Sequence, residues 1–272
     1  MTFLLSKLIL SSVTIIAITG VCGFNLKMTA NAPQLRAVLW DVDGTLADSY
    51  MLGYASTNTV FRNNGLPEIG EDVYHMGTKY TTPRRLAWHS TGNPDDDCGI
   101  ELGNQFDNLY VNLVSLETAP FYNGISDVLS SLVKEYPSLR HGALSNACGA
   151  YVTAVLRVNS VTNDFVIGLG ADDVPAAKPC PDGLLQICDV LQIHPSQCIY
   201  VGDSPSDGQA AKNAGMPSVG VTWGSHPIET VEPAFTYKVN IKISIILPNY
   251  CDFRSTDFPN ISDKINRSDS VL

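Results

Sequence analysis

Two aspartates, Asp41 and Asp43, stand two residues apart directly after a short apolar run. On a tight turn both side chains can project into one crevice, where one carboxylate could act as a nucleophile or metal ligand and the other as a proton carrier. Gly44 lets the backbone approach closely, and Thr45 adds a hydroxyl beside exposed amides. An Asx turn at the end of a strand explains one aspartate easily and two poorly, which favours a chemical role.

Three later segments carry polar side chains suited to an anionic group. Ser145 and Asn146 offer a hydroxyl and an amide beside backbone N–H groups that could hold phosphate oxygens. Lys178 stands with prolines that mark a helix start, where an ammonium and the helix dipole both favour an anion. Asp203 and Asp207 return two more carboxylates. Singly these residues fit a solvated turn, a surface lysine and a helix cap; together they predict one site.

Short apolar runs recur along the chain, and their composition is typical of strands buried in a parallel sheet. Helical patterns lie between them, for example at residues 125–133 and 184–191. The alternation predicts an α/β fold, with a Rossmann-like parallel sheet core covered by helices. The carboxyl ends of its strands would bring the polar groups to one edge. The predicted strands are residues 36–40, 142–145, 165–168, 198–201 and 218–221.

The alternation is interrupted between residues 52 and 120, where helical spacing dominates, as at residues 54–64 and 102–116. This block predicts a small helical cap domain inserted after the first strand, over the ligand edge of the sheet. Its cationic cluster, Lys79, Arg84 and Arg85, could reach a distal carboxylate or second anion on a substrate. A solvated helix start paired with nearby acids is an equally weighted alternative.

The composition narrows the class of protein. The 272 residues are 44% hydrophobic and 16% charged, which excludes a disordered chain and a polytopic membrane protein. The 27 acidic against 17 basic side chains give a net charge of −10. Nucleic-acid binding usually requires a basic surplus, so no nucleic acid is expected as a partner. An acidic protein that handles an anion needs a metal ion or a few well-placed cations.

The first 40 residues hold three basic and no acidic side chains, unlike the rest of the chain. The apolar run at residues 8–21 has the length of a signal-peptide core, since a spanning helix needs roughly 20 apolar residues. Residues 1–33 resemble the bipartite signal and transit presequence of proteins sent to secondary plastids, so plastid localisation is expected, with only transient membrane contact. A secretory signal and an uncleaved anchor are the alternatives.

The polar groups at the strand ends resemble the four motifs of the haloacid dehalogenase superfamily: D-x-D-G-T-[LV], Ser/Thr, Lys and G-D-x-x-x-D. The resemblance covers about residues 36–247. It implies an α/β core at residues 34–51 and 121–247 and a C1 cap at residues 52–120, leaving a polar tail at residues 248–272 without a functional interpretation.

The resemblance also implies roles for single residues. Asp41 would be the nucleophile that forms an aspartyl-phosphate, and Asp43 the acid that protonates the leaving alcohol and then activates water. Asp41, the backbone carbonyl of Asp43 and Asp203 would hold Mg²⁺, with Asp207 orienting that shell. A hard divalent cation suits this chemistry because a carboxylate and a phosphate dianion repel each other. The predicted phosphate-binding residues are Thr45, Ser145, Asn146 and Lys178.

The second aspartate separates the reactions of the superfamily. Displacement of a halide needs no leaving-group proton, whereas cleavage of a phosphate ester does, so Asp43 favours a phosphatase or phosphomutase. The overall spacing is most similar to phosphoglycolate phosphatases, and the expected partner is a small phosphorylated metabolite. A phosphomutase of the β-phosphoglucomutase type, a sugar or nucleotide monophosphatase and a non-catalytic binding protein remain alternatives. The sequence does not indicate an oligomeric state.

Overall fold

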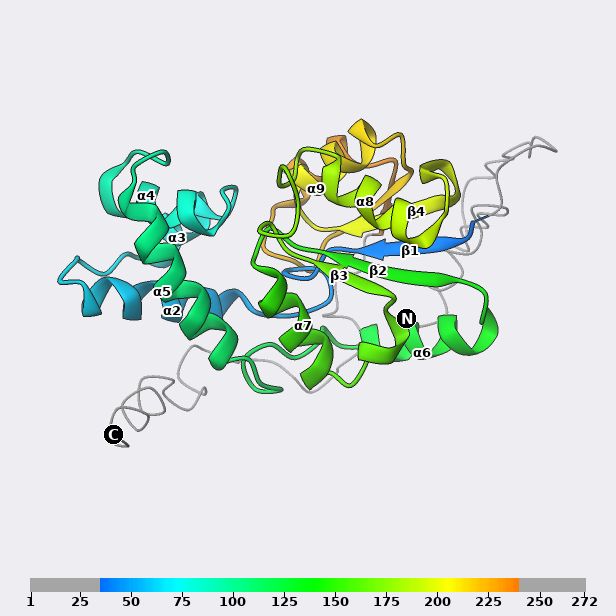
Figure 1. Cartoon of the computed structure of the whole chain (residues 1–272), viewed down its shortest axis with the longest axis horizontal. Coiled ribbons are helices and arrows are strands. Elements are labelled where there is room, and N and C mark those ends of the chain that lie inside the picture. The colour runs from blue at the N-terminus through cyan, green and yellow to red at the C-terminus, as the bar shows by residue number, and fades with distance from the viewer. Residues whose placement is uncertain (1–34, 240–272) are drawn as a thin grey trace. The chain divides into compact units, whose positions relative to one another are not determined.

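A parallel sheet lies at the centre of the fold (Figure 1). The computed structural model describes residues 35–239, so the predicted targeting segment and polar tail lie outside the described residues. The sheet has six strands in the order β3-β2-β1-β4-β5-β6, and all neighbouring strands are parallel. The strands are β1 Ala37–Trp40, β2 Arg140–Leu144, β3 Ile167–Leu169, β4 Cys198–Gly202, β5 Ser218–Val221 and β6 Tyr237–Val239.

The central strands are buried on both faces, as their apolar composition predicts. In β1, Leu39 pairs with Gly142 on one side and with Tyr200 on the other. Helices cover both faces: α8 and α9 lie on one side of the sheet, and α6 and α7 on the other (Figure 1). These core helices are α6 Ile125–Glu135, α7 Gly149–Val158, α8 Asp182–Leu191, α9 Pro205–Asn213 and α10 Ile228–Val231. The predicted fold class is confirmed.

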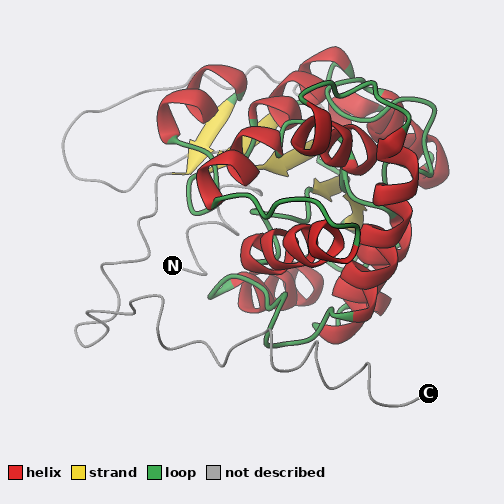
Figure 2. Cartoon of the chain, turned by 90° about the vertical axis from the view of Figure 1, so that its left-hand side faces the viewer, coloured by secondary structure: helices red, strands yellow, loops and turns green. Residues whose placement is uncertain are grey.

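Four helices separate β1 from β2 and form the insertion, called the cap below: α2 Tyr50–Asn63, α3 Glu71–Gly77, α4 Thr82–Thr91 and α5 Cys98–Asn112. Seen from the cap side, helices stand in front of the strands (Figure 2). Gly99 and Gly103 of α5 lie against Pro83 of α4, where a larger side chain at Gly99 would collide with the Pro83 backbone. The absence of side chains at these positions therefore lets α4 and α5 pack closely.

Several details differ from the predicted elements, among them the bounds of β2, which occupies residues 140–144 rather than 142–145. The third strand occupies residues 167–169 rather than 165–168, because Phe165 and Val166 lead into it from a short 3-10 turn. The strand β6 was not predicted. Lys178 precedes α8 by four residues, so it lies in a loop rather than at the helix start where its sequence context suggested.

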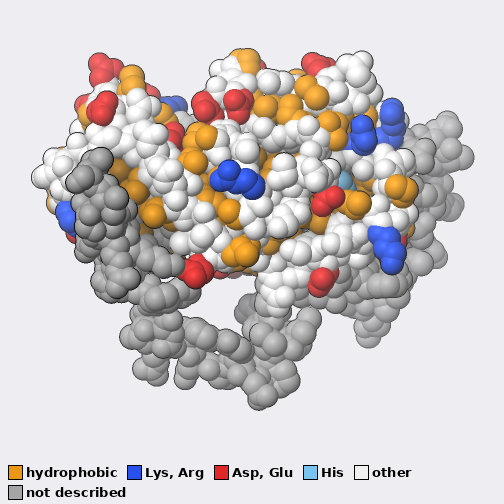
Figure 3. All heavy atoms as spheres, turned by 60° about the horizontal axis from the view of Figure 1, so that its bottom comes forward, with side chains coloured by type: hydrophobic (Ala, Val, Ile, Leu, Met, Phe, Trp, Pro, Cys, Tyr) orange, Lys and Arg blue, Asp and Glu red, His pale blue; other side chains and the backbone are white. Residues whose placement is uncertain are grey.

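The outer surface carries charges of both signs. On the face in Figure 3, basic side chains form small separate groups among neutral and acidic ones. Within residues 35–239, no helix combines the length and the apolar composition needed to cross a membrane.

Candidate active site

The turn after β1 brings its two aspartates to the carboxyl edge of the sheet. Asp41 is buried, and its backbone N–H donates to the Val201 carbonyl at 2.8 Å. The turn is closed by the Gly44 N–H, which donates to the Ala47 carbonyl at 3.0 Å. Gly44 has φ +77°, and a Cβ atom here would collide with the carboxylate of Asp203. Glycine is therefore required both by the backbone angle and by the approach of β4.

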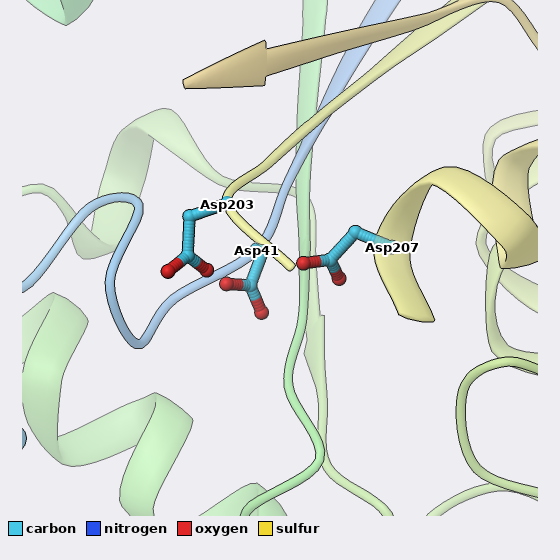
Figure 4. Close-up of side chains that lie close together, drawn as sticks. All are labelled: Asp41, Asp203 and Asp207. Carbon is cyan, nitrogen blue, oxygen red and sulfur yellow. The ribbon is translucent and has the colours of Figure 1, made fainter. Parts of the chain in front are cut away.

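Three buried carboxylates meet at this edge: Asp41 after β1, Asp203 after β4 and Asp207 in α9 (Figure 4). One ligand oxygen from each lies within 4.8 Å of the others. Mg²⁺ binds preferentially to oxygen ligands such as carboxylates. Three carboxylates buried together repel one another, and a bound cation would relieve that repulsion. The residues present thus fit the predicted metal, and Asp207 belongs to the same cluster as Asp41 and Asp203.

Lys178 neutralises part of this charge. Its Nζ donates to Asp41 Oδ1 at 2.6 Å and to Asp207 Oδ1 at 2.7 Å, and also to the Tyr200 hydroxyl at 3.1 Å. Burial alone would lower the pKa of Lys178, but Asp207 and Asp41 raise it well above its ordinary value. The ammonium therefore stays charged and fixes the orientation of both carboxylates.

The carboxylates respond differently to this environment. Burial and the neighbouring charge of Asp207 raise the pKa of Asp41 well above its ordinary value. Burial likewise raises the pKa of Asp203, although the imidazole of His226 opposes the shift. Burial alone would raise the pKa of Asp207, but Lys178 and the hydrogen bonds from Ser204 hold it below the ordinary value. A divalent cation here would relieve the unfavourable charge at Asp41 and Asp203.

Asp43 lies beside this cluster and accepts hydrogen bonds from four hydroxyl groups. Its Oδ1 accepts from Ser49 Oγ at 2.6 Å, Tyr151 at 2.6 Å and Tyr110 at 3.0 Å. Its Oδ2 accepts from Ser145 Oγ at 2.8 Å. The two tyrosines could not be identified from the sequence, because each comes from a helix far along the chain and no local motif marks it.

The predicted phosphate-binding residues take up two kinds of position. Ser145, Asn146 and Lys178 line the pocket above the aspartates. Asn146 also joins two loops, since its side chain exchanges hydrogen bonds with the Lys178 backbone at 3.1 and 3.2 Å. Thr45 is fully buried and is not part of the pocket lining; its hydroxyl donates to Asp41 Oδ2 at 3.1 Å. In this structure the Thr45 hydroxyl therefore holds Asp41.

Comparison with known proteins decides the family. Residues 38–221 match the family model described as haloacid dehalogenase-like hydrolase. The chain belongs to this family. The resemblance seen in the four motifs, and the prediction that the protein is a hydrolase, are both confirmed.

Bacterial relatives match over most of the chain. The phosphoglycolate phosphatase of Shigella boydii is 32% identical over 235 residues, which span 79% of this chain and 92% of that protein. The phosphoglycolate phosphatase of Escherichia coli K12 is 31% identical over the same length and shares.

Solved structures of lower identity share the fold. CbbY from Rhodobacter sphaeroides, in complex with phosphate, has a TM-score of 0.64 at 19% identity and covers 76% of this chain and 94% of its own. A haloacid dehalogenase-like family protein from Streptococcus pneumoniae has a TM-score of 0.65 at 20% identity, with 75% and 93% covered.

The pocket of this haloacid dehalogenase-like hydrolase has walls from both the core and the cap. The core contributes Lys178, the loop that carries His226 and three aspartates, Asp41, Asp43 and Asp203. The cap contributes an aromatic wall and one cation. The cap residues that line the pocket are Tyr50, Tyr74, Thr78, Tyr80, Thr82, Arg85, Phe106 and Tyr110.

The three cationic residues of the cap are placed differently. Arg85 is buried and lines the pocket, whereas Lys79 and Arg84 are not part of the lining. Arg84 is exposed and pairs with Asp95 at 2.9 Å. The ammonium of Lys79 lies 5.0 Å from the ring centre of Tyr80, outside the pocket. The structure therefore separates Arg85 from its two neighbours in the predicted specificity cluster.

Proposed function

We propose that this protein is a Mg²⁺-dependent phosphatase that hydrolyses a small, carboxylate-bearing phosphate monoester of the phosphoglycolate type. The observation that carries the proposal is the position of Asp41, which lines the pocket, pairs with Lys178 at 2.6 Å and forms a buried cluster with Asp203 and Asp207. The names of the relatives, phosphoglycolate phosphatase, support the substrate class.

Hydrogen bonds fix the orientation of the Asp41 carboxylate, as a nucleophile requires. Lys178 fixes its Oδ1 and Thr45 fixes its Oδ2, so little rotational freedom remains to be lost in reaction. Asp41, Asp203 and Asp207 would hold Mg²⁺, which would supply charge neutralisation for the phosphate oxygens. Phosphoryl transfer asks a protein mainly for such positioning and charge compensation.

In the first step, a carboxylate oxygen of Asp41 forms a bond to phosphorus while the bond from phosphorus to the ester oxygen breaks. Asp43 gives its proton to the departing alkoxide, which leaves as the alcohol. In the second step, water attacks the aspartyl-phosphate, its proton passes to Asp43, and the bond between phosphorus and Asp41 breaks. Phosphate is released, and both aspartates return to their starting states.

The position of Arg85 favours a substrate that carries a second anionic group. Its guanidinium lies 4.5 Å from the ring centre of Phe106 and 5.1 Å from that of Tyr74, and it donates to the Thr57 hydroxyl at 2.8 Å. Among residues 35–239, no carboxylate lies within 4 Å of its guanidinium nitrogens. Burial raises the pKa of Asp107 and the charge of Arg85 opposes that shift, but the two residues form no ion pair, so the guanidinium is suited to bind a carboxylate of the ligand.

The test is phosphate release by the full-length chain from a panel of monoesters with Mg²⁺ present. The panel contains 2-phosphoglycolate, hexose phosphates and nucleoside 5′-monophosphates. Among these monoesters we expect the highest kcat/KM for 2-phosphoglycolate, and we expect a chelator to abolish the activity. Release of no phosphate from any monoester would overturn it, and isomerisation of a hexose phosphate without phosphate release would establish the phosphomutase alternative.

We also propose that residues 1–33 direct the protein to a plastid, on the strength of the short apolar run followed by an acid-free segment. A fusion of these residues to a fluorescent protein, expressed in an alga with a secondary plastid, should accumulate in the plastid. Accumulation in the secretory pathway or medium would contradict the proposal.

A further inference from the structure

The carboxyl group of Asp43 is held by a pair of tyrosines from different parts of the fold. Tyr110 comes from α5 in the cap and Tyr151 from α7 in the core, and both rings are buried. Their ring centres are 4.2 Å apart with planes at 19°, so the two phenols are stacked. Both hydroxyls donate to the same atom, Oδ1 of Asp43.

We infer that Tyr110 and Tyr151 are positioning residues for Asp43 and that, through Tyr110, the cap helps to place the acid–base group. The inference rests on the proposed function, in which Asp43 transfers the proton to the leaving group. It assigns a task in the reaction to two residues outside the four sequence motifs.

The hydrogen bonds leave the two oxygens of Asp43 in different situations. Oδ1 accepts from three hydroxyls, those of Ser49, Tyr110 and Tyr151. A carboxylate has about four lone-pair sites, about two on each oxygen, so three donors leave no site free on Oδ1. Oδ2 accepts only from Ser145 among the described residues, and Ser145 lines the pocket. Oδ2 is therefore the oxygen that exchanges a proton with a substrate.

The surroundings keep both phenols in the donor form. Burial, followed by the charge of Asp43, raises the pKa of Tyr110 and of Tyr151 well above the ordinary value. Phe106 stacks on Tyr110 with ring centres 4.8 Å apart, which restrains the ring from the cap side. Because Tyr110 is the cap's contribution, any displacement of α5 would remove one of the three donors to Oδ1 while Ser49 and Tyr151 remained.

The test compares substrates whose leaving groups differ in their need for a proton. An alkyl monoester such as 2-phosphoglycolate needs a general acid, whereas p-nitrophenyl phosphate releases a stable anion without one. The variants are Tyr110→Phe and Tyr151→Phe, which keep the stacked rings. Tyr54→Phe is the matched control, because that cap hydroxyl donates to the Ile69 carbonyl and makes no contact with Asp43.

General acid–base catalysis contributes roughly a hundredfold or more to the rate. Tyr110→Phe and Tyr151→Phe each remove one donor to Asp43 and should therefore lose part of this contribution, lowering kcat/KM for 2-phosphoglycolate by about tenfold. The ratio kcat/KM is used because it covers the steps up to departure of the leaving group. With p-nitrophenyl phosphate both variants should stay within about twofold of wild type, and Tyr54→Phe should match wild type on both substrates.

An equal loss on both substrates, or no loss on 2-phosphoglycolate, would overturn the positioning inference and leave the proposed function standing. A wild-type protein inactive on both substrates would overturn the proposed function and this inference with it. Thermal unfolding of each variant separates a positioning effect from a general loss of folded protein.

Discussion

Arg84 and Arg85 are adjacent in sequence but differ in every physical respect. Arg84 is exposed and pairs with Asp95, an arrangement that contributes little energy because water and salt screen it. Arg85 is buried between aromatic rings, and in the described part of the chain it interacts with Asp107 without forming an ion pair. Retaining such a charge is costly unless a ligand compensates it. Substitution of Arg84 can therefore serve as the control for substitution of Arg85.

Substituting Arg85→Gln should weaken recognition of the substrate carboxylate. A hydrogen bond to a charged group contributes about 1.5–3 kcal/mol. We therefore expect kcat/KM for 2-phosphoglycolate to fall by roughly tenfold to a hundredfold, at 1.4 kcal/mol per tenfold. For 2-hydroxyethyl phosphate, which lacks the carboxylate, the ratio should change by about twofold or less. Arg84→Gln should behave as wild type; equal losses in both arginine variants would contradict the assignment.

Sequence reasoning succeeds for residues whose role is encoded locally. Asp41 and Asp203 could be predicted because each directly follows an apolar strand, and parallel strands end at one edge. Tyr110 and Tyr151 could not, because they are 67 and 108 residues from Asp43, on helices where a buried tyrosine is an ordinary core residue. The internal position of Thr45 also depends on the closed turn, which spacing alone does not reveal.

Strands β1 and β2 share a buried polar contact that makes the sheet sensitive to acid. Trp40 Nε1 donates to His141 Nδ1 at 3.1 Å, so the imidazole accepts as a neutral ring. Burial lowers the pKa of His141 from 6.5 to about 4. The folded state therefore binds this proton less readily than the unfolded state. Stability from this group is complete above pH 6.5 and is lost as the pH falls toward 4.

The His141 contribution can be measured by urea unfolding at pH 7 and pH 5. Wild type should lose about 2 kcal/mol more over this interval than His141→Gln, because protonation of the unfolded chain no longer opposes folding in the variant. The same substitution at His194, which is exposed, is the matched control and should leave the wild-type loss unchanged. An unchanged loss in His141→Gln would contradict the linkage.

Helices and strands with a strong apolar pattern could be predicted from the sequence, whereas those with a weak pattern could not. The central strands were recognisable as buried apolar runs, and α5 as a helix with a regular apolar stripe that includes Leu102 and Phe106. The shorter α3 has seven residues of which two are buried, so it carries little periodic signal. The edge strand β6 has three residues and is defined by pairing with β5, which composition does not specify.

The whole chain has a net charge of −10, and three of its acidic side chains, Asp41, Asp203 and Asp207, lie together in one buried cluster. Lys178 bonds to two of these carboxylates, whereas Asp203 contacts His226 at 3.5 Å and accepts a hydrogen bond from the Ser225 backbone N–H at 3.1 Å. The folded state therefore contains uncompensated buried negative charge. A cation that binds only this state should stabilise the entire chain.

Adding Mg²⁺ to chelator-treated full-length protein should raise its unfolding temperature. At a hundred times the dissociation constant, a ligand of the folded state contributes about 2.7 kcal/mol. For a domain of this size that corresponds to a shift of roughly 5–10 °C. Asp203→Asn should abolish the shift, while Asp95→Asn, on the exposed cap surface, should retain it. A full shift in Asp203→Asn would contradict a metal site at this cluster.

The proposed role of Asp41 as the residue that carries the phosphoryl group can be tested by measuring phosphate release from 2-phosphoglycolate by Asp41→Asn beside wild type, with Mg²⁺ present. Asparagine keeps the shape of the side chain but lacks the nucleophilic charge. We expect kcat to fall by at least about a thousandfold in a variant that unfolds as cooperatively as wild type. Activity within about tenfold of wild type would contradict it.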